Sequence, residues 1–100
     1  MKIWICGHQG MLGQHCLAQM QKRQLPFVVS DRDTVDITHA SQVLDFMQTH
    51  SISHILNCAA YTAVDLAETE PLAAYAINAM GPKHLSTAAK QCNAYLIHFS

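Results

Sequence analysis

Short apolar runs alternate with longer amphipathic stretches along the whole chain. Apolar runs of strand length lie at residues 3–6, 27–29, 54–60 and 95–99. Runs of this kind are typical of strands that are buried on both faces of a sheet. Between them, apolar residues at helical spacing predict helices over residues 11–23, 40–50 and about 71–91. We therefore expect the element order βαβαβαβ.

Local signals refine the predicted helices. Thr38 stands where it could cap the second helix. Pro71 suits the first position of the third helix. Gly81 and Pro82 interrupt that helix, so we expect a kink or two abutting helices there.

The alternation of strands and helices indicates the fold class. Each helical crossover returns the chain in the same direction, so the strands must pair in parallel. Right-handed crossovers then predict an α/β fold with a doubly wound, Rossmann-like parallel sheet. With the strands numbered along the chain, we expect the order 3-2-1-4. The length of 100 residues suits one domain, residues 1–100.

Composition argues against several classes of function. The residues are 50% hydrophobic and 13% charged, which is enough apolar material for a core. A net charge of −1 favours neither nucleic acid nor a membrane surface as partner. Cys6, Cys16, Cys58 and Cys92 are scattered without a C-x-x-C pair, so we expect reduced thiols and no metal site. The first apolar run is too short for a signal peptide, and we expect a cytoplasmic protein.

A glycine-rich loop follows the first predicted strand. Gly7, Gly10 and Gly13 form G-x-x-G-x-x-G between that strand and the first helix. Glycine allows the tight turn and the close approach of a pyrophosphate to the helix N-terminus. Asp31 follows Gly13 by 18 residues, at the end of the second strand, where a carboxylate can bind an adenosine ribose. The loop therefore predicts a dinucleotide site, the alternative being three glycines that serve only the turn.

Arg32 leaves the choice of cofactor open. Asp31 favours the free ribose hydroxyls of NAD, whereas an adjacent arginine can neutralise the 2′-phosphate of NADP. Arg32 could equally be a solvated surface charge. We expect NADP or NAD.

The loop spacing resembles that of the extended short-chain dehydrogenase/reductases. Within them, residues 36–38 (Asp-Ile-Thr) and 57–65 (Asn-Cys-Ala-Ala-Tyr-Thr-Ala-Val-Asp) are similar to the dTDP-4-dehydrorhamnose reductase family. The resemblance covers the whole chain. It implies an NAD(P)H-dependent oxidoreductase that reduces a 4-keto nucleotide sugar to dTDP-rhamnose, for polysaccharide biosynthesis. A homodimer is left open.

The resemblance also implies roles for individual residues. The three glycines would shape the pyrophosphate site with backbone contacts from Gln9, Met11 and Leu12, and Asp36 and Ile37 would lie against the adenine. The cofactor trough would be lined by Ala59, Ala60 and Tyr61, and the nicotinamide or sugar nucleotide would be faced by Thr62, Val64 and Asp65. Asn78 would support the active site. Each of three residues has an alternative interpretation. Asp36 could be a turn acid, Tyr61 a surface aromatic, and Asn78 a polar residue at a helix kink.

The family's catalytic pair, Tyr-x-x-x-Lys, is missing from these residues. The positions four residues after Tyr61, Tyr75 and Tyr95 hold aspartate, alanine and phenylalanine. Ser100 resembles the residue that precedes the family's catalytic hydroxyl, although a supporting role is an alternative. We therefore expect the N-terminal part of a longer enzyme, truncated after the fourth strand and inactive alone.

Three other interpretations stay open. A sugar-nucleotide epimerase or dehydratase would share the glycine loop, although residues 57–65 favour the reductase. A non-catalytic NADP-binding module, similar to the regulatory subunit of methionine adenosyltransferase, would bind a partner protein. An inert remnant would lack an in-frame continuation past residue 100.

Overall fold

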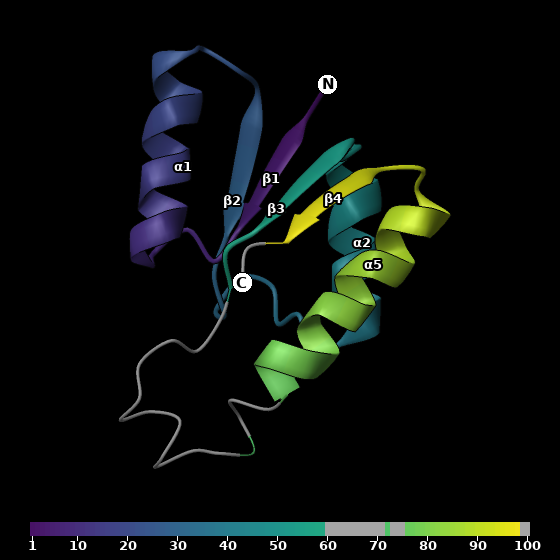
Figure 1. Cartoon of the computed structure of the whole chain (residues 1–100). Coiled ribbons are helices and arrows are strands. Elements are labelled where there is room, and N and C mark those ends of the chain that lie inside the picture. Colours follow the sequence, from purple (N-terminus) through teal and green to yellow (C-terminus); the bar gives the residue numbers. More distant parts are fainter. Residues whose placement is uncertain (60–71, 73–75, 99–100) are drawn as a thin grey trace.

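The computed structural model describes residues 1–59, 72 and 76–98 (Figure 1). The strands in this part of the chain are β1 (Ile3–Cys6), β2 (Phe27–Ser30), β3 (His54–Asn57) and β4 (Tyr95–His98). The helices are α1 (Met11–Lys22), α2 (Ala40–His50) and α5 (Gly81–Gln91), and a π-helical turn, η1 (Ala76–Met80), precedes α5. None of these helices has the length and apolar character needed to cross a membrane.

The strands form one parallel sheet in the order β2-β1-β3-β4 (Figure 1). The predicted α/β class and parallel pairing are therefore confirmed. The predicted order 3-2-1-4 is wrong, because β3 pairs with β1 on the side away from β2. Alternating strands and helices indicate parallel pairing but not the edge on which each strand is added. Here the chain leaves β2, crosses to the other face through α2, and returns beyond β1.

Helices cover both faces of the sheet. Figure 1 shows α1 on one side and α2 with α5 on the other. The side chains of β1 alternate accordingly, as a strand buried on both faces requires. Ile3 and Ile5 pack in one apolar cluster with Cys16 of α1. Trp4 and Cys6 pack in a second cluster, which also contains buried residues of α2 and α5.

Most predicted boundaries agree with the structure to within a residue. The range 40–50 is confirmed for α2, and α1 ends one residue before the predicted position, with Arg23 as its C-cap. The expected interruption near Gly81 is confirmed, since η1 abuts α5 and Pro82 lies in the first turn of α5. The third predicted run, 54–60, forms a strand over His54–Asn57, where its ladder with β1 ends.

The predicted cap of α2 is wrong. The N-cap position of α2 is His39, and no side chain within the described part of the chain makes a capping hydrogen bond there. The hydroxyl of Thr38 instead donates a hydrogen bond to the Asp36 carboxylate, at 2.6 Å. Threonine prefers such local bonds in turns as well as at caps, so the residue type alone did not distinguish the two.

Candidate functional site

A cleft of about 520 Å³ opens at the carboxyl ends of β1, β2 and β3. Adjacent strands β1 and β3 lead to helices on opposite faces, α1 and α5 (Figure 1). Open parallel sheets bind ligands at such a topological switch point. The cleft is lined by Cys6, Gly7, Gln9, Gly10, Asp31, Arg32, Asp33, Val35, Asp36, Ile37, Cys58 and Ala59.

The loop between β1 and α1 forms one wall of this cleft. Gly7 has a φ of +80°, and a Cβ atom there would lie 2.7 Å from the Cα and N atoms of Ala59. A Cβ atom at Gly13 would collide with the Gly7 carbonyl oxygen and approach the Cα atom of His8 at 2.7 Å. Gly10, the N-cap of α1, has open space, its nearest atom being 3.9 Å away. Two of the three glycines are thus required by close backbone contacts.

Helix α1 begins directly after Gly10, which lines the cleft. No side chain in the described residues makes a capping hydrogen bond at Gly10, and the first turn contains no acidic residue. Unpaired N–H groups and the helix dipole favour an anion at such a position. Met11 and Leu12, which follow, are 94% and 40% exposed. Neither they nor Gly13 line the cleft itself.

Asp31 follows β2 and lines the cleft beside the glycine loop. Its Oδ2 atom accepts a hydrogen bond of 2.7 Å from the Gln9 side-chain amide. Its Oδ1 atom accepts from the backbone N–H groups of Asp33 and Thr34, at 3.0 and 3.2 Å. Arg32 lines the same cleft. The structure thus places Gln9, which the resemblance assigns to the pyrophosphate, beside Asp31 and in the same cleft as Arg32, the two residues that the sequence predicts for the ribose.

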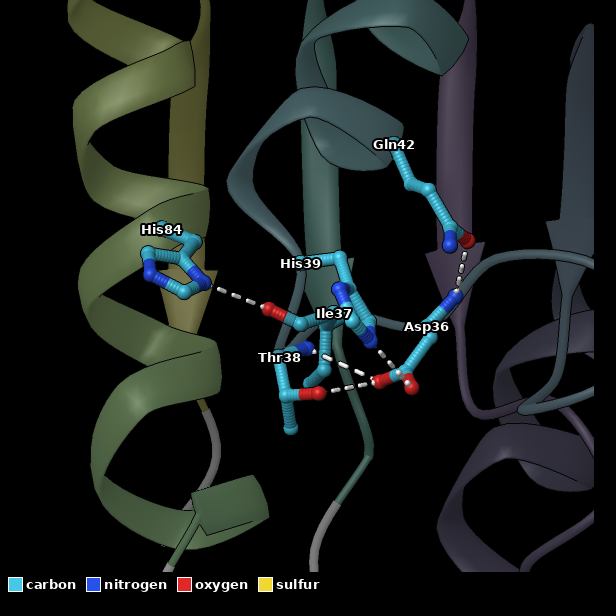
Figure 2. A network of polar contacts seen from close by, with 6 residues as sticks. All are labelled: Asp36, Ile37, Thr38, His39, Gln42 and His84. Atoms are coloured by element: carbon cyan, nitrogen blue, oxygen red, sulfur yellow. Dashed lines mark hydrogen bonds and ion pairs between the residues drawn. The ribbon is translucent and has the colours of Figure 1, made fainter.

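Asp36 lies in a polar network on the segment that leads into α2 (Figure 2). Its Oδ1 atom accepts hydrogen bonds from the N–H and hydroxyl of Thr38, and its Oδ2 atom lies 3.4 Å from His39 Nε2. The Thr38 hydroxyl lowers the pKa of this carboxyl, against the opposing effect of burial, and the Thr38 N–H, His39 and Arg32 lower it further. Asp36 therefore makes the hydrogen bonds of a turn acid, which is the alternative interpretation of this residue. It also lines the cleft.

Ile37 connects the cleft to α5. Its carbonyl oxygen lies 2.9 Å from Nδ1 of His84, which projects from α5 (Figure 2). Its side chain is buried and contacts the backbone of α5 at Gly81, where a Cβ atom would collide with the Ile37 Cδ1 atom. The position of the segment at residues 35–37 therefore depends on α5.

The remaining predicted site residues are placed only in part. Ala59 lines the cleft and its N–H donates to the Asn57 side chain at 3.1 Å. Asn78 is exposed in η1. The other predicted positions lie outside the described residues, namely Ala60, Tyr61, Thr62, Val64, Asp65 and Ser100.

Four cleft residues were not predicted from the sequence: Cys6, Asp33, Val35 and Cys58. Asp33 and Val35 belong to the turn after β2, whose path no local motif indicates. Cys6 and Cys58 directly flank predicted site residues, so extending the motif by one position would have found them. Burial raises the pKa of each thiol to about 12, and all four cysteines are free. Within the described ranges no three His, Cys, Asp or Glu side chains are grouped as they are around a metal ion.

Comparison with known families agrees with this geometry. The RmlD substrate binding domain family matches residues 1–100. The chain belongs to this family. The RmlD-family chain is 36% identical to dTDP-4-dehydrorhamnose reductase of Streptomyces griseus, over 96% of this chain and 32% of that protein. It is 36% identical to the reductase of the same name from Mycobacterium tuberculosis, over 99% of this chain and 32% of that protein. The RmlD-family chain therefore spans about a third of the length of these relatives.

Solved structures show the same likeness. A dTDP-4-dehydrorhamnose reductase from Clostridium acetobutylicum has a TM-score of 0.87 at 38% identity, covering 96% of this chain and 34% of that one. The enzyme of this name from Bacillus anthracis, in complex with NADP, has a TM-score of 0.84 at 35% identity, covering 95% and 34%. UDP-glucose 4-epimerase of Thermus thermophilus, at 20% identity and a TM-score of 0.84, covers 94% of this chain and 35% of that one and shares the fold.

Proposed function

We propose that this chain is the cofactor-binding part of an NAD(P)H-dependent reductase of a 4-keto nucleotide sugar, with dTDP-4-dehydrorhamnose as the substrate of the full-length enzyme. The observation that carries the proposal is the cradle after β1, where Gly7 and Gly13 allow backbone contacts that a Cβ atom would prevent. The cradle leads into an uncapped helix N-terminus at a topological switch point. Family membership supports the choice of reaction.

The proposed dinucleotide would lie along the cleft. We assign the pyrophosphate to Gly7, Gly10 and Gly13, with backbone contacts from Gln9, Met11 and Leu12. We assign the adenosine ribose to Asp31 and Arg32, and the adenine to Asp36 and Ile37. The nicotinamide half would lie beyond Ala59, along Ala60 and Tyr61. Thr62, Val64 and Asp65 would face the sugar nucleotide, with Asn78 and Ser100 in supporting roles.

The same residues indicate which part of the reaction belongs to the cofactor and which to this chain. A bound reduced nicotinamide supplies the reducing equivalent, and the chain positions it. Acid catalysis at the substrate carbonyl needs a group such as the family's Tyr-x-x-x-Lys, and the 100 residues contain none. We therefore propose that this chain alone binds cofactor without reducing sugar. We further propose a cytoplasmic location, supported by the likeness to dTDP-4-dehydrorhamnose reductases, and a homodimer as one arrangement for sedimentation to test.

Thermal unfolding of the chain tests the proposal. Purified chain is heated alone, with NADPH, with NADH, and with nicotinamide as a control that lacks the pyrophosphate. A ligand that binds only the folded state adds about 2.7 kcal/mol at 100 times its dissociation constant, which raises the Tm of a domain this size by several degrees. We expect a rise with one or both dinucleotides and none with nicotinamide. A cooperative transition that neither dinucleotide shifts would exclude the proposed function for this chain.

A further inference from the structure

The Asp31 carboxylate is already largely occupied by partners within the chain. A carboxylate offers about four lone-pair directions, two on each oxygen. Oδ1 accepts hydrogen bonds from the N–H groups of Asp33 and Thr34, at 3.0 and 3.2 Å. Oδ2 accepts from the Gln9 side-chain amide, at 2.7 Å. Among the described residues, Oδ1 thus accepts from two backbone N–H groups and Oδ2 from one side-chain amide.

Gln9 reaches Asp31 from the neighbouring glycine loop. It lies in the loop between Gly7 and Gly10, and this loop is fixed to β2 through hydrogen bonds from the Gly7 and His8 N–H groups to the Ser30 carbonyl, at 2.9 and 3.3 Å. Gln9 and Asp31 both line the cleft. A loop attached at this point directs the Gln9 amide at Asp31 before any ligand arrives.

The hydrogen bond between Gln9 and Asp31 bears differently on the binding of a free ribose and of a ribose with a 2′-phosphate. A ribose with free 2′- and 3′-hydroxyls is bound by a carboxylate that accepts from both hydroxyls, and such binding competes with Gln9 for Oδ2. A ribose that carries a 2′-phosphate brings an anion instead. For this anion, an Asp31 charge already engaged by an amide donor is less repulsive, and Arg32 lines the same cleft.

We propose that Gln9 is a specificity-determining residue, which holds Asp31 back from the free ribose of NADH and so favours NADPH. This inference rests on the proposed function, because it concerns the same cleft and the same pair of cofactors.

The test measures the dissociation constants of NADPH and NADH for the chain and its variants by isothermal titration. Gln9→Met keeps the length of the side chain and removes the donor. Gln21→Ala, an exposed glutamine on α1, is the matched control. The expected change in affinity is on the scale of one hydrogen bond to a charged group. We therefore expect NADH to bind about fivefold tighter to Gln9→Met, while the affinity for NADPH does not rise. The control should leave both constants unchanged.

A second background shows whether the effect acts through Asp31. Asp31→Asn keeps an oxygen for the N–H groups of Asp33 and Thr34 and removes the charge. In this background Gln9→Met should leave the ratio of the two dissociation constants unchanged. Gln9 is exposed, so the Tm values without cofactor should agree and show that each variant folds.

The outcomes separate this inference from the proposed function. If both cofactors bind and Gln9→Met leaves their ratio unchanged, the inference is wrong and the proposed function stands. If both cofactors bind more weakly by the same factor, Gln9 contacts a part common to both, and the inference is again wrong. If neither cofactor binds to the unaltered chain, both proposals fail together.

Discussion

A methyl group added at each of the three loop glycines would meet a different environment. At Gly7 it would face the Ala59 backbone at 2.7 Å, on a residue with a φ of +80°. At Gly13 it would meet the Gly7 carbonyl oxygen and the His8 backbone, neither of which can move independently of the loop. At Gly10 it would have space. The loop therefore contains two sterically required glycines and one that serves as an N-cap.

Alanine at each glycine should separate these roles. We expect Gly7→Ala and Gly13→Ala to lower the free energy of unfolding by about 2–3 kcal/mol each, through overpacking and, at Gly7, backbone strain. Gly10→Ala should cost less than about 1 kcal/mol, the scale of an altered N-cap. Urea unfolding measures all three. Equal losses at the three positions would show that the close contacts do not decide stability.

Cys6 gives the fold a pH dependence on the alkaline side. Burial raises its pKa from 9.0 to about 12, partly offset by a hydrogen bond with Ser30. Between these values the folded chain holds a proton that the unfolded chain has released, so the free energy of unfolding falls as pH rises. The stabilisation is complete below pH 9 and is lost as pH approaches the folded pKa of about 12.

Urea titrations at pH 8 and pH 10 test this dependence. One thiol with these pKa values should remove about 1.4 kcal/mol over that interval. Cys6→Ala is the comparison, because it keeps every other titrating group. We expect it to start less stable, owing to the cavity, and to lose about 1.4 kcal/mol less on going to pH 10. The same loss in both proteins would contradict a shifted thiol at position 6.

At the scale of elements, the contact between Ile37 and α5 sets the position of one wall of the cleft. The Ile37 side chain occupies the space that a Cβ atom at Gly81 would need, and the His84 ring meets the Ile37 carbonyl from the next turn (Figure 2). Of the two colliding atoms, Cδ1 is the far end of the side chain, whereas Cγ1, at 2.9 Å, is bonded directly to the Ile37 Cβ atom. Replacing Ile37 by alanine removes both atoms and should therefore relieve the clash.

In a double-mutant cycle at positions 37 and 81, we expect the effect of Gly81→Ala on the free energy of unfolding to change sign. Gly81→Ala alone should destabilise the chain, because the clash outweighs the gain in helix propensity. Ile37→Ala alone should cost about 2–5 kcal/mol through lost burial and the cavity left behind. In the Ile37→Ala background, Gly81→Ala should become stabilising, by up to about 1 kcal/mol of helix propensity. Additive effects in thermal or urea unfolding would show that the two residues do not compete for space.

The elements also show what the sequence could and could not predict. Helix α2 was located correctly because Val43 and Met47, which are buried, repeat at helical spacing. The strand order was wrong, since crossovers of the same length and hand can add a strand at either edge. Thr38 was assigned as a cap because its hydroxyl suits a cap, whereas the structure uses it to hold Asp36.

The cleft likewise contains residues that could be predicted from the sequence and contacts that could not. Gly7 and Asp31 were predicted from the glycine motif and its acidic partner, and Ala59 from the family resemblance; all three line the cleft because parallel strands end at a common edge. Val35 was missed because it reaches the cleft through a turn, which is fixed by long-range packing against α5. The hydrogen bond between Gln9 and Asp31 was also beyond prediction, since it depends on two loops, 22 residues apart in sequence, that lie side by side in the fold.

At the scale of the whole molecule, stability is distributed unevenly across the sheet. All four residues of β1 are buried, and the strand is paired on both sides, with β2 and β3. Among the described strands β4 pairs with β3 alone, and its Tyr95 and Ile97 are exposed. Both apolar clusters contain β1 residues, so opening this strand requires both layers of helices to separate.

Amide hydrogen exchange of the chain should follow this distribution. Local opening has a free energy that rises from near zero at exposed segments to the global value in the core. We expect the hydrogen-bonded amides of β1 to exchange at the global free energy of unfolding measured by urea, and those of β4 to exchange through a smaller opening. Destabilisation by Cys6→Ala should then speed exchange in β1 by the full change in unfolding free energy and leave β4 nearly unaffected. If the exchange rates of β4 instead changed together with those of β1, the sheet would open as one cooperative unit. The edge position of β4 would then have no effect on its local stability.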